Sequence, residues 1–193
     1  KNKVKELSAR IEFDRKNGRS SSDNGHHMCL FGNPGTGKTT IVKIITGILY
    51  KEGIIRYNQF LETDGNFLRG DTARETNEKI NLLVRFAKGK VLFIDEAYAM
   101  FSGSAYASQD VIATLIKLME DHRKEFVLIV AGYEEEMKQM IEANPGFKSR
   151  ISTYLHFPDY SNEELCQIFS TMANAKNLYV PAETMERLSK RFA

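Results

Sequence analysis

The segment 32–39 constrains this chain most: it reads Gly-Asn-Pro-Gly-Thr-Gly-Lys-Thr and matches the phosphate-binding loop pattern G-x-x-x-x-G-K-[ST] in full. An apolar run at 28–31 precedes it, and a helical pattern over 40–50 follows it. A strand, a glycine-rich loop and a helix in this order predict an α/β fold that binds a nucleotide polyphosphate with magnesium. The alternative, a glycine-rich turn that binds nothing, has no need of Lys-Thr at this offset.

Each position of the loop has a physical role. Glycines allow a tight turn that brings backbone N–H groups around an anion, and the helix that starts there adds its own N–H groups and positive dipole end. Lys38 is expected to reach the β- and γ-phosphates, and Thr39 to offer its hydroxyl to Mg²⁺. The candidate nucleotide-binding residues are Asn33, Pro34, Gly35, Thr36, Gly37, Lys38, Thr39 and Thr40.

The composition is that of a globular protein: 42% of the 193 residues are hydrophobic and 27% are charged, which suits one domain or one domain with a small appendage. A net charge of +2 without a long basic run gives no support to nucleic-acid binding. The sequence has no run of 18 apolar residues, so no membrane span is expected. Cys29 and Cys166, far apart in sequence, are interpreted as reduced thiols of a cytoplasmic protein. Because the chain begins without methionine and both ends lie in helical patterns, we expect a piece of a longer protein.

Strands and helices alternate over most of the chain. Strands are predicted at 27–31, 57–62, 90–94, 126–131 and 152–157. Helices are predicted at 3–13, 38–51, 72–87, 105–122 and 133–143, with a polar loop at 16–25. The runs 28–31, 91–94 and 126–130 are continuously apolar, which is typical of strands buried on both faces. The pattern therefore predicts a three-layer sandwich with a parallel five-stranded sheet over residues 1–158.

Only helical patterns follow Phe157-Pro158. Ser161 and Glu164 have the spacing of a capping box, which opens a helix of about 14 residues. Pro181 begins another helix, and no further strand is predicted. We therefore expect residues 159–193 to form the start of a separate helical element.

The second site motif is the apolar strand 91–94 followed by Asp95-Glu96, a Walker B element. The Asp95 carboxylate suits Mg²⁺, usually through the waters on the ion, and Glu96 can polarise a water for in-line attack on the γ-phosphate. The alternative is a pair of solvated carboxylates that cap a strand. A small-molecule kinase is a further alternative, but the Asp-Glu pair favours water as the acceptor.

Four further segments carry a family resemblance. They are Asp-Glu-Ala-Tyr (95–98), Val-Ala-Gly-Tyr (130–133), Asn-Pro-Gly-Phe-Lys-Ser-Arg (144–150) and Phe-Pro-Asp-Tyr (157–160). With the two site motifs, they resemble AAA+ ATPases of the stage V sporulation protein K and red-type Rubisco activase (CbbX-like) group. The resemblance implies a P-loop NTPase core followed by a small helical lid, with ATP and Mg²⁺ as ligands. It also implies ATP hydrolysis in a self-assembled ring, usually a hexamer, that acts on protein clients.

Arg150 matches the arginine finger of this family, which acts on the nucleotide of a neighbouring subunit. Guanidinium offers a rigid fork of donors to a phosphoryl group. The alternative is a surface arginine paired with a nearby carboxylate. A site shared between chains makes isolated chains poor catalysts. The family's second sensor arginine falls beyond Ala193, so we expect this fragment to be at most weakly active.

Other positions of the family pattern are less regular. Tyr133 stands near the usual polar sensor position, where it either senses nucleotide or packs beneath the site. The central-pore loop departs from the family's aromatic-aliphatic-Gly triplet, because Phe67-Leu68 are followed by Arg69 and Gly70. This departure leaves peptide threading by Phe67 and Leu68 open.

Two acidic residues and two histidines complete the candidates. Glu120 and Asp121 end the 105–122 helix and either face the adjoining subunit or form a solvated helix end. His26 and His27 have no partners at metal-ligand spacing, so no zinc site is expected.

Three functions are consistent with these motifs. The first is an ATP-driven motor that remodels protein partners. The second is a nucleotide-gated switch that binds a partner without threading it, which the unusual pore loop favours. The third is a nucleic-acid loader ATPase, which the charge does not support. The sequence does not identify the client, and Rubisco is only one client of the wider group.

Overall fold

The structure, a computed structural model, describes Ala9 and residues 25–101 and 105–192. The chain divides into two compact units, Lys1–Phe157 and Pro158–Ala193. The predicted helix 3–13 and the polar loop 16–25 lie outside the described residues, apart from Ala9 and Gly25.

The first unit is built on a five-stranded sheet in which every paired strand is parallel. Its strands are β1 (His27–Gly32), β2 (Phe60–Asp64), β3 (Val91–Asp95), β4 (Val127–Gly132) and β5 (Ile151–Phe157). Their order across the sheet is β2-β3-β4-β1-β5, so β1 lies between strands that come much later in the chain. The predicted parallel five-stranded sheet is confirmed.

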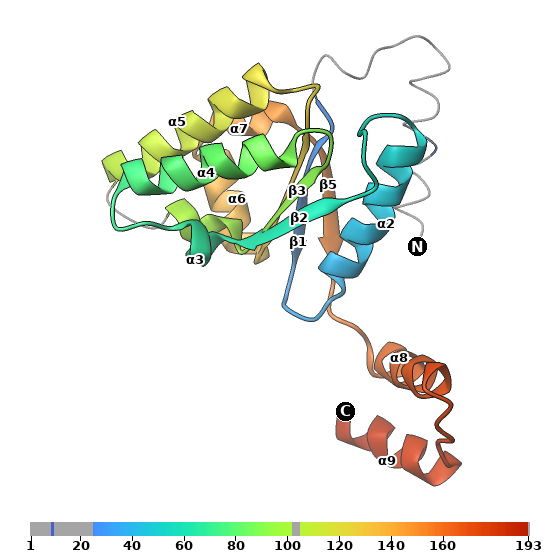
Figure 1. The fold of residues 1–193 in the computed structure, drawn as a ribbon. Helices are drawn as coiled ribbons and strands as arrows, with labels where there is room; N and C mark the ends of the chain where they lie inside the picture. Colours follow the sequence, from blue (N-terminus) through green and yellow to red (C-terminus); the bar gives the residue numbers. More distant parts are fainter. Residues whose placement is uncertain (1–8, 10–24, 102–104, 193) are drawn as a thin grey trace. The chain divides into compact units, whose positions relative to one another are not determined.

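Helices cover both faces of this sheet (Figure 1). On β1, Met28 and Leu30 pack against the helix α2 (Lys38–Lys51), whereas Cys29 and Phe31 point into the opposite layer. That opposite layer is formed by α4 (Ala73–Ala87), α5 (Ala105–Asp121), α6 (Glu134–Glu142) and α7 (Pro145–Arg150). Continuous apolar strands were expected to be buried on both faces, and here each successive side chain enters a different apolar cluster.

Among the described residues, the long helices begin and end within one residue of their predicted bounds, but three short helices were not predicted. The missed elements are α3 (Gly65–Leu68), the 3-10 helix η2 (Ala97–Phe101) and α7. Helices of four to six residues are not stable by themselves, so no local sequence pattern predicts them.

The predicted strand 57–62 is also wrong at its start, because β2 begins only at Phe60. The backbone N–H groups of Arg56 and Tyr57 both donate to the Gly89 carbonyl at 2.9 Å, which holds this segment outside the strand.

The second unit contains α8 (Asn162–Ala175) and α9 (Ala182–Phe192), which contact each other. α8 begins with the predicted capping box: the Glu164 N–H donates to Ser161 Oγ, and the Glu164 carboxylate accepts from the Ser161 N–H. Among the described residues, no helix is long and apolar enough to cross a membrane.

Candidate nucleotide-binding site

The phosphate loop joins the carboxyl end of β1 to the start of α2. Gly35 and Gly37 have φ angles of 80° and 87°, a left-handed conformation that glycine adopts without strain. At Gly32, a Cβ atom would lie 2.5 Å from the Phe157 carbonyl oxygen, so no side chain fits there. The loop therefore needs glycine at these three positions for reasons of backbone geometry alone.

Lys38 is buried at the first turn of α2. Its Nζ donates to the carbonyl oxygens of Gly32 at 2.8 Å and Asn33 at 3.0 Å. The Thr36 hydroxyl donates to the same Asn33 carbonyl at 2.7 Å. These bonds hold a positive charge at the N-terminal end of α2, where the helix dipole already favours an anion.

Two carboxylates follow β3 directly. Asp95 is its last residue, and Glu96 has a φ of 45°, so the chain turns immediately past the strand. Asp95 Oδ1 accepts the Glu96 N–H at 3.0 Å. Both carboxylates line one pocket with Lys38. The remaining lining residues are Gly32, Pro34, Gly132 and Tyr133. The structure therefore brings Lys38, Asp95 and Glu96 together, three residues that the sequence assigned to one site.

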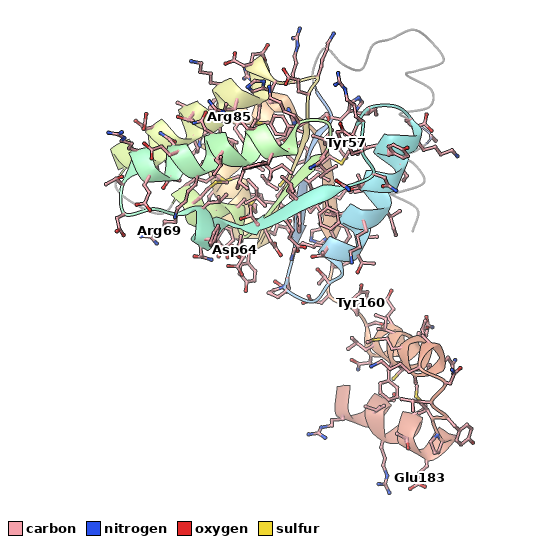
Figure 2. All side chains as sticks on the ribbon, in the orientation of Figure 1. Tyr57, Asp64, Arg69, Arg85, Tyr160 and Glu183 are labelled. Atoms are coloured by element: carbon pink, nitrogen blue, oxygen red, sulfur yellow. The ribbon has the colours of Figure 1, made fainter. Side chains whose placement is uncertain are left out.

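Asn66 also contacts this site, although it was not predicted. Its Nδ2 donates to Glu96 Oε2 at 3.0 Å. The Asn66 N–H donates to Asp64 Oδ1 at 2.7 Å, which caps α3 where it leaves β2 (Figure 2 labels Asp64). At Gly65 a Cβ would lie 2.2 Å from the Glu96 carbonyl oxygen, so glycine permits this close approach. The signal available in the sequence was the Gly-Asn pair directly after a strand that ends in aspartate.

Thr39 faces a carboxylate from β2. Its hydroxyl donates to Glu62 Oε1 at 3.4 Å, and Thr40 next to it is exposed. The oxygens of Thr39 and Asp95 are ligands that Mg²⁺ accepts. Within the described ranges, no three His, Cys, Asp or Glu side chains are grouped so that they could hold a metal. Magnesium in nucleotide sites commonly uses only one or two carboxylates together with the phosphates, so this donor set fits the ion.

Two tyrosine rings lie tilted against each other beside the pocket. The rings of Tyr98 and Tyr133 lie 6.0 Å apart, and a Cβ at Gly132 would be 2.8 Å from the Tyr98 ring. Loss of solvent, aided by the negative charge of Glu96, raises the pKa of Tyr98 to about 12. Tyr98 therefore remains a protonated phenol at neutral pH. Tyr133 lines the pocket, and its role as a sensor remains a prediction.

Arg150 lies at the other edge of the sheet. It ends α7 and precedes Ile151, which pairs with His27 at the beginning of β1, whereas the phosphate loop follows the end of β1. The six residues of β1 separate the two edges by about 20 Å. The structure therefore does not bring Arg150 to Lys38 or Glu96 of its own chain.

Within its own chain, Arg150 has two partners. Nη1 donates to the Gly146 carbonyl at 2.9 Å, and Nη2 lies 3.3 Å from Glu120 Oε2. This is the carboxylate pairing that was the alternative to a finger. Glu120 and its neighbour Asp121, which end α5, are both exposed.

The structure places the two candidate pore residues, Phe67 and Leu68, in different environments. Leu68 is fully buried in the core, so its side chain is not presented to a client. Phe67 is 71% exposed, and the Lys79 ammonium lies 5.7 Å from its ring centre. Both residues lie in α3, a helix of four residues, in which successive side chains point in different directions.

His27 makes a structural contact in the core. It is buried, and its Nδ1 accepts the Leu128 N–H at 2.9 Å. Burial is the main cause that lowers the pKa of His27 to about 4, so the ring is neutral at pH 7.

Comparison with known families and proteins agrees with the predicted resemblance. Residues 28–159 match the model of the ATPase family associated with various cellular activities (AAA). Protein CbbX of Cereibacter sphaeroides is 35% identical over 188 residues, which cover 95% of this chain and 61% of that protein. Stage V sporulation protein K of Bacillus subtilis (strain 168) is 34% identical over 192 residues, which cover 97% of this chain and 60% of that protein. The chain thus spans about three fifths of these relatives.

A solved structure supports the fold. The crystal structure of the FIGL-1 AAA domain in complex with ADP aligns with a TM-score of 0.58 at 20% identity, and the match covers 86% of this chain and 54% of that one. The predicted resemblance to the stage V sporulation protein K and CbbX-like group is confirmed, and so is the predicted fold class.

Proposed function

Because the chain belongs to the AAA family of ATPases, we propose that it binds Mg·ATP at the carboxyl edge of its sheet and hydrolyses it with water. The observation that carries this proposal is that Lys38, Asp95 and Glu96 line the same pocket. An ammonium for the phosphates, a carboxylate for magnesium and a carboxylate for water are the groups that this reaction needs.

Within the pocket, backbone N–H groups of residues 33–40 surround the phosphates, and Lys38 contacts the β- and γ-phosphates. Its present carbonyl partners leave one of its three N–H bonds for a phosphate oxygen. Thr39 and Asp95 hold Mg²⁺, which when bound neutralises charge on the β- and γ-phosphates. The Glu62 contact draws the Thr39 proton away from the ion, which leaves the hydroxyl lone pairs for the metal.

Glu96 acts as the base that orients and polarises the attacking water. Asn66 holds one oxygen of this carboxylate, and the other oxygen has no part in that bond. The contact therefore fixes the direction of the carboxylate and leaves one oxygen for the water.

Arg150 serves the pocket of a second copy. Because about 20 Å of strand separates it from its own pocket, any contact with a γ-phosphate is made in another chain. A head-to-tail contact of this kind closes into a ring when the rotation permits, and we propose a hexamer. An arginine supplied in this way contributes about 10³–10⁵ in rate, or about 4–7 kcal/mol of the barrier.

The assembled ring acts on protein clients in the cytoplasm. The second unit, Pro158–Ala193, serves as the beginning of the helical lid. A nucleotide-gated switch without threading is a second candidate, because the buried Leu68 leaves Phe67 as the only predicted pore residue that is exposed. A nucleic-acid loader has no comparable observation in its favour.

Hydrolysis as a function of protein concentration tests this proposal. If the site is shared, turnover per chain rises with concentration and is lowest for dilute chains, and the chain is at most weakly active when monomeric. A turnover per chain that is equally high at nanomolar and micromolar concentration would contradict the shared site. Comparing client unfolding with nucleotide-dependent pull-down separates the motor from the switch.

A further inference from the structure

Glu120 bridges two arginines at the end of α5. Its Oε2 lies 3.3 Å from Arg150 Nη2, and its Oε1 lies 3.4 Å from Arg123 Nη1. The two residues of the Arg150 pair come from different helices, α5 and α7. No local pattern in the sequence predicts this contact.

The donors of Arg150 can be counted. Guanidinium has five N–H bonds, two on each terminal nitrogen and one on Nε. Nη1 donates one N–H to the Gly146 carbonyl, and Nη2 forms an ion pair with Glu120 at 3.3 Å. The Nε atom is buried and has no partner among the described residues. At least one N–H therefore remains on each terminal nitrogen, and a phosphoryl group can accept from both.

We propose that Glu120 is a positioning residue for Arg150, which it holds so that both terminal nitrogens keep one N–H for the phosphoryl group of a neighbouring chain. This inference rests on the proposed shared site. The contact orients Arg150 without sequestering it, because Glu120 is about half exposed and exposed ion pairs bind weakly. Because Nε is buried, the two terminal nitrogens are the donors that a neighbouring phosphoryl group can reach.

Three variants distinguish a positioning role of Glu120 from a general structural role. Glu120→Ala removes the contact, and a misplaced guanidinium lowers kcat about tenfold while KM for Mg·ATP stays within about twofold. Glu120→Gln keeps the length and an acceptor oxygen, so kcat stays within about threefold of the unmodified chain. Glu78→Gln is the control, because Glu78 forms an exposed pair with Arg74 within α4 and neither residue lines the pocket or pairs with Arg150, and it leaves kcat unchanged.

Mixing experiments distinguish this proposal from the proposed function. A Lys38→Ala chain has no working pocket but supplies a well-placed arginine, so adding it raises the turnover of Glu120→Ala chains. If Arg150→Ala chains gain activity from the Lys38→Ala chain but Glu120→Ala has the kcat of the unmodified chain, only the role of Glu120 is overturned. If Arg150→Ala chains gain nothing, the shared site itself fails.

A second readout does not depend on hydrolysis. In ¹⁵N spectra, a guanidinium held on two sides gives separate signals for its terminal nitrogens, and Glu120→Ala is expected to merge those of Arg150. The Arg150→Lys variant identifies the signals. Signals that are identical in the unmodified and Glu120→Ala chains would overturn the positioning role.

Discussion

The two edges of the sheet are built in different ways. The carboxyl edge holds the phosphate loop and the Asp95-Glu96 pair, and each of these is a contiguous segment of sequence. The opposite edge holds Arg150, whose partners are Glu120 from α5 and the Gly146 carbonyl one turn earlier in α7. The first edge has the groups that we propose bind a nucleotide, whereas the second presents a cation about 20 Å away.

Because of this difference, we propose that nucleotide binding and charge compensation are supplied by two different chains. Binding needs only the carboxyl edge, whereas charge compensation during phosphoryl transfer needs the other edge of a neighbour. Variants at the two edges therefore have separable effects on affinity and on turnover.

The largest effect on turnover is expected at the edge that holds Arg150, which we call the arginine edge. Arg150→Ala lowers kcat by about 10³–10⁵ because charge on the transferred phosphoryl group loses a donor. Its affinity for Mg·ATP, measured by direct titration, stays near that of the unmodified chain. Equal losses of affinity and turnover would place Arg150 in nucleotide binding and remove the distinction between the edges. Arg74→Ala on α4 serves as the control.

A smaller loss of turnover is expected at the carboxyl edge. Glu96→Gln keeps the shape of the side chain and an acceptor for Asn66, but its amide cannot take a proton from water. Hydrolysis falls by about 10²–10⁴ while Mg·ATP still binds. Single-turnover hydrolysis and equilibrium titration measure the two quantities. Full hydrolysis by this variant would show that Glu96 is not the base.

The smallest effect concerns stability at the arginine edge. Burial chiefly lowers the pKa of His27 to about 4 from 6.5, with the nearby charges of His26 and Arg150 adding to it and a backbone contact with Met119 opposing it. Between these pKa values the unfolded chain binds more protons than the folded one, so stability rises with pH there and is lost as pH falls from 6.5 toward 4. From pH 7 to pH 5, His27 lowers the free energy of unfolding by about 2 kcal/mol.

Denaturant unfolding at both pH values checks this. His27→Asn keeps an acceptor at the position of Nδ1 for the Leu128 N–H and removes the titration, so its stability falls less over the same interval. The two chains are compared by how their free energy of unfolding changes with pH, and not by its absolute value. Equal slopes in both chains would show that His27 is not the source of the pH dependence.

The sequence predicted the carboxyl edge far better than the arginine edge. Lys38, Thr39 and Asp95 lie in motifs whose spacing follows from backbone geometry, and continuous apolar strands required two covering layers. Asn66 was missed because it acts through α3, a four-residue helix that exists only in its tertiary setting. The pairing of Glu120 with Arg150 was also out of reach, because it depends on how α5 and α7 pack together.

Mixing Lys38→Ala chains with Arg150→Ala chains tests the shared site most directly. Each variant alone is expected to hydrolyse almost no ATP. In an equal mixture, a pocket from an Arg150→Ala chain meets an intact arginine from a Lys38→Ala chain, so random assembly restores about a quarter of the unmodified turnover. An equal mixture that remains as inactive as either variant alone would contradict a site divided between two copies.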